Sequence, residues 1–255
     1  MITSSKNSKL QKVRALLEHH KRGEPFVAEG VRLVEEGLSA GWQPELMLYS
    51  AQISERGRTL IQNVVQTGTS VEEVDERVFR SLTATENPQG LLAVFPPLSK
   101  PLPENWSLLL IIDQLRDPGN LGTILRTAHA VGVDGIFLTS GSVDPFSSKV
   151  IRAGMGAHFH LSLFTENWDL IVSTCQQKHA RVLLAETNCG DDLWSTNLRG
   201  PVALVIGGEA EGASETAHKL ADACIHIPMP GQSESLNAAV AAAILLFEVV
   251  RQRTE

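Results

Sequence analysis

The sequence predicts an α/β fold in two parts, because short apolar segments alternate with amphipathic ones along most of its 255 residues. Residues 108–113 form a continuous apolar run, which is typical of a strand buried on both faces of a parallel sheet. Four prolines between residues 96 and 103 can continue neither a sheet nor a helix and favour an extended spacer. We therefore expect a small α/β domain over residues 1–95, a proline-rich linker over 96–105 and a second domain with a mainly parallel sheet over 106–255.

The composition predicts a globular protein, with 43% hydrophobic and 20% charged residues. The cysteines Cys175, Cys189 and Cys224 are widely spaced and form no Cys-x-x-Cys pair, so neither a disulfide framework nor a zinc site is expected. With no secretory segment at the N-terminus, this pattern predicts a reduced, cytoplasmic protein. No apolar run approaches the roughly 18–20 residues of a membrane span. The net charge of −7 argues against a generally basic surface, although a local basic patch could still bind phosphate.

The N-terminal part begins with a basic segment over residues 1–22, in which Leu10, Val13 and Leu16 recur at helical spacing. This helix is either an ordinary solvated surface helix or a contact for the RNA backbone, made through Lys9, Lys12 and Arg14. The pattern then predicts strands over 26–28, 44–49, 70–74 and 89–95, and helices over 30–40, 54–66 and 75–81.

In the second part, the turn at Asp117 leads into a helix for which Asn120 is a plausible N-cap. An apolar stripe on this helix ends at Gly132, and Arg126 lies off the stripe. Further strands are expected over 135–138, 158–164, 181–185, 202–206 and 225–228, and further helices around 149–152, over 168–178 and over 238–248.

Three clusters of polar residues and glycines follow the apolar strands of this part, where α/β proteins bind ligands. They are Asn120 to Arg126, Gly207 to Gly212, and Ser235 to Asn237. Each has a structural explanation by itself: a cap and a surface charge, a tight glycine turn, and a loop before a packing helix. The glycine cluster is neither Gly-x-Gly-x-x-Gly nor a phosphate-binding loop, which disfavours a dinucleotide dehydrogenase and a nucleoside triphosphatase.

Together, Asn120-x-Gly-x-x-x-Arg126, Gly207-x-Glu209-x-x-Gly212 and Ile227-Pro-Met229 with Ser235-Leu-Asn237 resemble the three motifs of the SpoU/TrmH family. These are RNA ribose 2′-O-methyltransferases of the SPOUT superfamily, and the resemblance covers roughly residues 107–250. The N-terminal part resembles the substrate-binding domain often appended to this family, through residues 26–32, which include Arg32 as a further candidate for RNA contact. Ala238, Ala239 and Gly154 depart from the common family pattern, which leaves the shape of the pocket open.

The resemblance implies a trefoil-knotted catalytic domain, a homodimer whose active site is completed from both chains, and S-adenosylmethionine as cofactor without a metal. It implies that the cofactor contacts Gly207, Gly208, Ile227, Met229 and Leu236, with Thr187 as a weaker candidate. Arg126 is the base proposed for the family, but an arginine stays protonated in proteins, so a clamp on the RNA phosphate and the attacking oxygen is the alternative. The resemblance assigns the orientation of the ribose and of Arg126 to Asn120, Glu209, Ser235 and Asn237.

The expected function is therefore S-adenosylmethionine-dependent methylation of a ribose 2′-hydroxyl in ribosomal RNA, with transfer RNA as the alternative substrate. A noncatalytic RNA- or ribosome-binding protein on the same fold is an alternative, although it would be expected to have lost Arg126, Glu209 or Asn237, and all three are present. A methyltransferase acting on a base nitrogen finds no support in these motifs.

Overall fold

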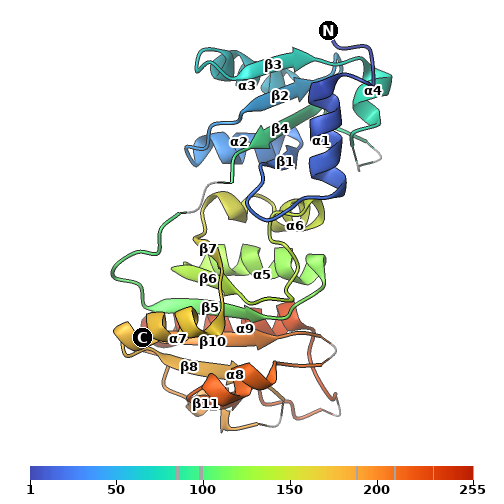
Figure 1. Ribbon diagram of the computed structural model, residues 1–255. Helices are drawn as coiled ribbons and strands as arrows, with labels where there is room; N and C mark the ends of the chain where they lie inside the picture. The colour runs from blue at the N-terminus through green and yellow to red at the C-terminus, as the bar shows by residue number, and fades with distance from the viewer. Residues whose placement is uncertain are drawn as a thin grey trace. The chain divides into compact units, whose positions relative to one another are not determined.

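A computed structural model describes residues 1–83, 85, 87–97, 100–187, 189–209, 211–231 and 233–254 (Figure 1). The chain divides into two compact units, one of Met1–Leu98 with Asp144–Phe159 and the other of Ser99–Val143 with His160–Glu255. A four-stranded sheet lies in the first unit and a seven-stranded sheet in the second, which confirms the predicted α/β class. Residues 144–159, expected within the second domain, group with the first unit. The boundaries at 95 and 105 stay a prediction, and residues 98 and 99 of the predicted linker lie outside the described part.

In the first unit the helices and strands alternate as the sequence predicts. The strand order is β1-β4-β2-β3, with β4 antiparallel to β1 and β2, and β2 parallel to β3. The basic helix is shorter than its segment, because Asn7 caps it by accepting a hydrogen bond from the Lys9 amide at 2.9 Å. The elements are α1 (Ser8–Glu18), β1 (Phe26–Glu29), α2 (Val31–Ser39), β2 (Leu46–Tyr49), α3 (Glu55–Val65), β3 (Ser70–Glu73), α4 (Glu76–Arg80), β4 (Leu91–Phe95), α6 (Ser148–Gly154) and the 3-10 helix η1 (Ala157–Phe159).

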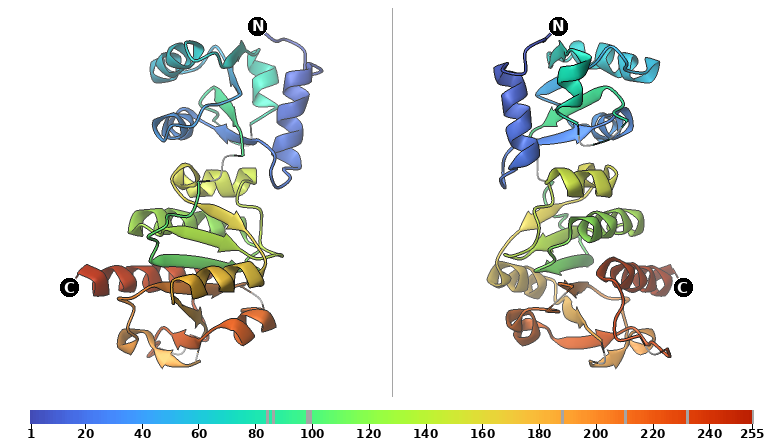
Figure 2. Two further views of the ribbon diagram at one scale, coloured as in Figure 1. Left: turned by 60° about the vertical axis from the view of Figure 1, so that its left-hand side comes forward. Right: turned by 90° about the vertical axis from the view of Figure 1, so that its right-hand side faces the viewer.

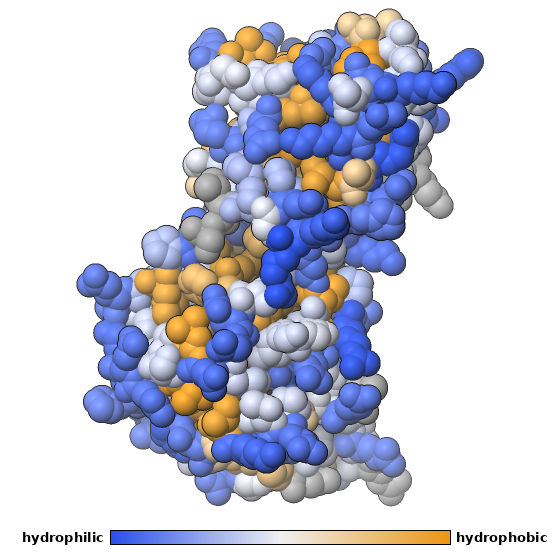
Figure 3. All heavy atoms as spheres, in the orientation of Figure 1, coloured by the Kyte–Doolittle hydropathy of each residue, from blue (hydrophilic) through white to orange (hydrophobic). Residues whose placement is uncertain are grey.

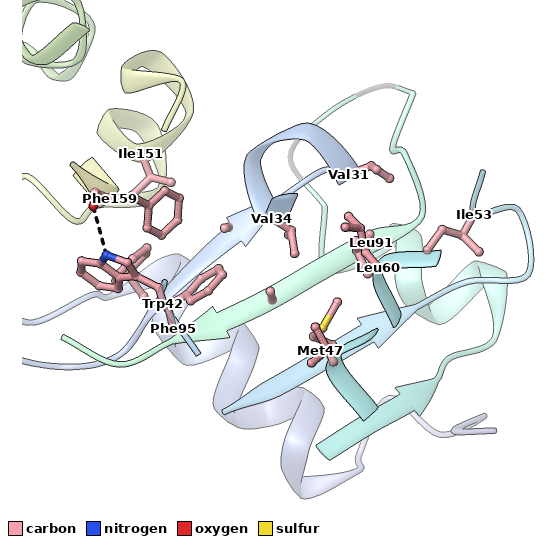
Figure 4. Close-up of a cluster of buried hydrophobic side chains, with 14 residues drawn as sticks. Val31, Val34, Trp42, Met47, Ile53, Leu60, Leu91, Phe95, Ile151 and Phe159 are labelled. Atoms are coloured by element: carbon pink, nitrogen blue, oxygen red, sulfur yellow. Dashed lines mark hydrogen bonds between the residues drawn. The ribbon is translucent and has the colours of Figure 1, made fainter. Parts of the chain in front are cut away.

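An aromatic cluster explains why residues 144–159 belong to this unit (Figure 4). Phe159 packs edge-on against Trp42 and Phe95, and the Trp42 indole donates a hydrogen bond to the Phe159 carbonyl at 3.1 Å. Ile151 of α6 lies in the same buried cluster. The core of the first unit is therefore completed by a segment that follows it by about fifty residues in the chain.

The strand predicted over residues 158–164 is wrong in its first half. His158 and Phe159 lie in η1, and Phe159 packs into the core of the first unit instead of joining the sheet of the second. A Cβ atom on Gly154 would overlap the His158 ring. The departure from the family pattern at Gly154 therefore concerns packing around His158 and not the shape of the pocket.

The second unit is built on a sheet of order β7-β6-β5-β10-β8-β11-β9, in which every described pair of neighbouring strands is parallel. Its elements are β5 (Leu108–Asp113), α5 (Pro118–Val131), β6 (Gly135–Leu138), β7 (Leu163–Thr165), α7 (Trp168–Gln177), β8 (Arg181–Ala185), β9 (Asp191–Asp192), η2 (Leu193–Ser195), β10 (Val202–Gly207), α8 (Glu215–Leu220), β11 (Ala223–His226) and α9 (Ala238–Thr254). The predicted, mainly parallel sheet is confirmed.

Helices cover both faces of this sheet, with α5 and α9 on one side and α7 and α8 on the other (Figure 2). Because side chains alternate along a strand, Leu109 and Ile111 of β5 pack toward the α7 side with Ile171. The strand predicted to reach Pro228 ends at His226, where it pairs with the short strand β9 that the sequence did not predict. Proline has no N–H to continue such a ladder.

Two of the three cysteines contradict the expectation from the sequence. Cys189 and Cys224 are joined as a disulfide, whereas Cys175 is free and buried. Burial, together with the charge of Asp222, raises the pKa of the Cys175 thiol to about 11.

Within the described part of the chain, every helix is too short or too polar to cross a lipid bilayer.

His158 makes the stability of the protein sensitive to acid. Its Nε2 lies 2.8 Å from the Pro145 carbonyl, and burial lowers the pKa of its side chain from 6.5 to about 4. Because the unfolded chain takes up this proton at higher pH than the folded chain, we expect stability to fall as the pH falls from 6.5 toward 4. The His158 contribution to the free energy of unfolding should decrease by about 2 kcal/mol between pH 7 and pH 5.

Urea unfolding of His158→Gln at both pH values measures this contribution, since glutamine retains a donor for Pro145 and cannot titrate. His19→Gln, at an exposed histidine, is the matched control. Burial lowers the pKa of His20, but its hydrogen bond to Asp144 outweighs this and raises it, so His20 stabilises the protein at low pH in both variants. An acid sensitivity equal to that of the original protein in His158→Gln would contradict the prediction.

Candidate functional site

A pocket of about 600 Å³ opens at the carboxyl ends of β8, β10 and β11 in the second unit. The strand ends are level there, because Ile206 pairs with Ala185 and Ile225 pairs with the same residue. All six residues that the sequence indicated for the cofactor line this pocket, namely Gly207, Gly208, Ile227, Met229, Leu236 and Thr187. The sequence analysis missed other residues of the pocket wall, including Glu186, Glu211, Ile225 and Ala241. Finding them would have required knowledge of the register of the strands.

A chain of hydrogen bonds joins the three sequence motifs at this pocket. The Asn120 amide donates to Glu209 Oε1 at 2.9 Å, and the Asn237 amide donates to Asn120 Oδ1 at 2.9 Å. Each side chain comes from a different element: Asn120 from α5, Glu209 from the turn after β10, and Asn237 from the residue before α9. The fold therefore brings together three residues that are far apart in sequence.

The expected helix cap at Asn120 is wrong, and the actual cap leaves Asn120 available to the site. Asp117 caps α5 by accepting from the Asn120 backbone N–H at 2.7 Å, and Pro118 occupies the first turn. The Asn120 side chain is thus free to contact Glu209. Asn237 has two tasks, because its Oδ1 also accepts from the Ala239 N–H at 2.9 Å and caps α9.

Glu209 accepts hydrogen bonds from its surroundings on both carboxylate oxygens. In addition to Asn120, the backbone N–H groups of Arg116 and Asp117 approach it at 3.4 and 3.3 Å. Burial alone would raise the pKa of Glu209, but the hydrogen bonds from Asn120 and the backbone outweigh this and lower it. A carboxylate held in this way is a weak base and a firm anchor for Asn120.

The glycines at 207 and 208 are required by contacts inside the protein. A Cβ at Gly207 would lie 2.5 Å from the Ala213 nitrogen, and one at Gly208 would lie 2.7 Å from the Gln114 carbonyl oxygen. The turn closes through a hydrogen bond from the Gly208 N–H to the Gly212 carbonyl at 2.9 Å. The glycines thus allow the turn to fold tightly next to the end of β5, as the tight glycine turn expected from the sequence requires.

Asp113 is a buried residue next to the site, opposite Gly207 in the sheet, and the sequence did not single it out. It ends β5 and accepts hydrogen bonds from the Thr139 hydroxyl at 2.8 Å, the Ser214 N–H at 2.7 Å and the Trp168 indole at 3.3 Å. It thereby fixes the segment after the glycine turn to the carboxyl end of β5. An acidic residue at the end of an apolar run was the available signal.

Arg126 and Ser235 lie differently from the three connected residues. Arg126 is exposed on α5 and is not part of the pocket wall, and among the residues that the structure describes its side chain has neither a hydrogen-bond nor an ion-pair partner. Ser235 lines the pocket, and its carbonyl accepts from the Ser233 hydroxyl at 2.9 Å. Their catalytic roles remain predictions.

The candidate RNA contacts lie in the first unit. Lys9 pairs with Glu72, Lys12 lies 3.5 Å from Glu45, and Arg14 donates to the Ser81 hydroxyl at 3.3 Å. Acidic neighbours therefore offset much of the charge of α1. Arg32 is exposed at the start of α2 and borders a second hollow of about 300 Å³. Hydrophilic residues and apolar patches alternate over the face of the protein drawn in Figure 3.

Comparisons with known proteins agree with these motifs. Residues 107–247 match the SpoU rRNA Methylase family, and residues 7–93 match the MRM3-like substrate binding domain. The chain is 33% identical over 251 residues to the Bacillus subtilis 23S rRNA (guanosine(2553)-2′-O)-methyltransferase RlmP, covering 97% of this chain and 98% of the relative.

Two solved structures show the same architecture. The SpoU methyltransferase AviRb from Streptomyces viridochromogenes, in complex with the cofactor AdoMet, has a TM-score of 0.87 and 26% identity, covering 97% of this chain and 99% of that one. The AdoMet-bound rRNA methyltransferase from Sinorhizobium meliloti has a TM-score of 0.86 and 33% identity, covering 98% and 97%. With its three motifs joined at one pocket and its family match over residues 107–247, the chain belongs to the SpoU methylase family.

Proposed function

We propose that the protein transfers a methyl group from S-adenosylmethionine to a ribose 2′-hydroxyl of ribosomal RNA. The hydrogen-bonded chain Glu209–Asn120–Asn237 beside a pocket of about 600 Å³ is the observation that carries this proposal. The Bacillus subtilis relative is a 23S rRNA methyltransferase and the Sinorhizobium meliloti relative is an rRNA methyltransferase, which favours ribosomal over transfer RNA as the substrate. A noncatalytic RNA-binding role would not require the three motifs to stay connected.

The pocket suits S-adenosylmethionine in size and in chemistry. Its volume lies within the usual range of small-molecule sites, roughly 300–1,000 Å³. Ile206, Ile225 and Met229 offer an apolar surface for an adenine ring, while Glu186 and Glu211 offer carboxylates for hydroxyl and ammonium groups. Gly207, Gly208, Ile227, Leu236 and Thr187 would complete the contacts. The bound cofactor supplies a methyl group on a positively charged sulfur.

The protein's own residues position the RNA ribose and stabilise the charge that develops on its oxygen. Asn120 and Asn237 hold each other in place, and Glu209 fixes Asn120, so Glu209 acts as a positioning residue. Arg126 would clamp the neighbouring phosphate and the developing alkoxide, because its guanidinium is a fork of fixed charge. Ser235 lies on the pocket wall and would contribute a hydroxyl to the ribose.

A homodimer is part of the proposal, and α9 supplies its candidate interface. Val240 and Phe247 are 49% and 55% exposed, and together with Ile244 they recur at a spacing that places them on one face of the helix. Helix α9 packs against α5, which carries Arg126. A partner on this face could bring Arg126 to the second active site. The trefoil threading and cytoplasmic location expected from the sequence also belong to this proposal.

Replacing Arg126 tests the proposed reaction directly. Arg126→Lys keeps the charge but loses the planar fork, so single-turnover methyl transfer to ribosomal RNA should fall by about a hundredfold or more. Cofactor affinity should stay nearly unchanged, because Arg126 does not line the pocket. Labelled S-adenosylmethionine and mass spectrometric mapping of the methylated ribose provide the measurement.

Arg199→Lys, at an exposed arginine of the same unit, is the matched control. Near-normal transfer by Arg126→Lys would remove Arg126 from the catalytic residues. A methyl group on a base, or in transfer RNA only, would overturn the proposed substrate.

The two tasks of Asn237 can be separated by substitution. Asn237→Asp keeps an oxygen that caps α9 but loses the donor to Asn120, so stability should stay near that of the original protein while methyl transfer falls by about tenfold or more. Asn237→Ala also loses the cap and should be about 1 kcal/mol less stable. Urea unfolding and single-turnover transfer distinguish these effects; full activity of the aspartate variant would show that the hydrogen bond to Asn120 is dispensable.

Arg32 is the proposed phosphate contact of the first unit. Arg32→Gln should weaken RNA binding and reduce the slope of log K against log salt by about 0.7–0.9, the contribution of one phosphate contact. The triple variant Lys9→Gln, Lys12→Gln, Arg14→Gln tests α1 in the same titration. Arg77→Gln, at an exposed arginine on α4, controls for net charge. An unchanged salt slope would leave the tested residues as ordinary surface charges.

A further inference from the structure

We infer that Cys189 and Cys224 are a site of reversible oxidation, and that their disulfide controls how tightly the neighbouring pocket binds its ligand. Formation of the bond requires the two thiols and an oxidant, and no ligand in the pocket. Its effect on S-adenosylmethionine rests on the proposed function of the pocket.

The fold brings the two cysteines together from different segments. They are 35 residues apart in sequence and are joined as a disulfide. Cys224 lies in β11, opposite Leu184 of β8, and Cys189 lies between β8 and β9. Because β8 and β9 both pair with β11, the segment that carries Cys189 is held to β11 on both sides. Both cysteines are half-buried, so a small thiol reagent can reach them.

Gly190 shows that this closeness is built into the backbone. Its φ is +65°, and a Cβ atom at this position would overlap the carbonyl oxygen of Cys224. The residue after Cys189 therefore lies directly against the backbone of Cys224, and an L-residue with a side chain would not fit there. The main chain therefore brings the two cysteines close enough in the fold for their thiols to bond.

The same two segments form a wall of the pocket. Glu186 and Thr187 line it from the segment that leads to Cys189, and Ile225 and Ile227 line it from the strand that carries Cys224 and the residues beyond. The disulfide links these two parts of the wall covalently. Oxidation should therefore fix the wall in the shape that this structure shows, and reduction should let the Thr187 side move away from β11.

A low-molecular-weight disulfide such as oxidised glutathione is the proposed oxidant. One cysteine thiolate attacks it, forms a mixed disulfide and releases one glutathione thiolate. The second cysteine thiolate then attacks the mixed disulfide, forms the Cys189–Cys224 bond and releases the second thiolate. The two protein thiols lose two protons and two electrons, and the oxidant becomes two thiols.

A wall that is already fixed costs less ordering on binding, so the oxidised form should bind more tightly. Coupled sites commonly differ in affinity by about fivefold or more, and the coupling is reciprocal. Reduction should therefore weaken S-adenosylmethionine binding by about fivefold. Bound S-adenosylmethionine should, by the same factor, shift the glutathione equilibrium toward the disulfide.

The experiment uses the full-length protein equilibrated in mixtures of reduced and oxidised glutathione. Thiols are counted after denaturation, the bond is located by mass spectrometry of peptides, and binding is measured by calorimetry. We expect one free thiol in the oxidised form and three in the reduced form. Cys189→Ser and Cys224→Ser should each bind like the reduced protein and form no intramolecular disulfide at any glutathione ratio. Cys175→Ala, which removes the buried free thiol, should retain the full response.

Several outcomes would overturn the inference. These are the failure of a disulfide to form at any glutathione ratio, equal affinities of the oxidised and reduced forms, and a full redox response in either serine variant. The Glu186, Cys189 and Cys224 ligand atoms also lie within 4.8 Å of one another, so the reduced protein is tested with Zn²⁺ alone. Stoichiometric zinc binding that is lost in Cys189→Ser would assign the pair to a metal instead. If neither form binds S-adenosylmethionine while the disulfide still forms, the proposed function fails and the oxidation site stands.

Discussion

The catalytic unit depends on satisfying one buried carboxylate, that of Asp113 at the end of β5. A buried acidic group is costly unless it is hydrogen-bonded, and Asp113 obtains its donors from Thr139 after β6, Trp168 of α7 and Ser214 before α8. These hydrogen bonds hold four segments together at the carboxyl end of β5, in the middle of the parallel sheet. Ser214 comes shortly after the glycine turn that carries Glu209. Its hydrogen bond to Asp113 therefore also helps to hold this turn in place.

In the proposed reaction, one set of residues positions the ribose and Arg126 supplies the charge. Glu209 accepts hydrogen bonds from an amide side chain and two backbone groups, and Asn237 both caps α9 and donates to Asn120. Hydrogen bonds within the protein hold these residues in place, and their proposed role is to position the ribose. Arg126 is exposed and contributes a fixed charge whose counterpart would be RNA or a partner chain. A reaction that needs in-line approach of two reactants benefits mainly from such preorganisation.

The first unit shows how sequence boundaries and structural boundaries can differ. Phe159 and Ile151 complete an aromatic core whose other members come from residues 26–95. Their segment lies within the stretch that matches the methylase family, and it packs with the unit that matches the substrate-binding domain. Hydrophobic burial takes no account of chain order, so residues 144–159 belong to the first unit although they lie between two stretches of the second, which linkers and periodicity do not reveal.

The sequence by itself determined the fold class, the order of most helices and strands, and the residues Asn120, Glu209 and Asn237, because periodicity, turn residues and family motifs are local signals. All six residues that the sequence indicated for the cofactor line one pocket in the structure. Only the tertiary structure decided that Asp117 caps α5, that Asp113 anchors segments at the carboxyl end of β5, and that Cys189 meets Cys224. These features depend on which strands are neighbours and how closely their backbones approach, and such long-range contacts leave little trace in the local pattern of residues.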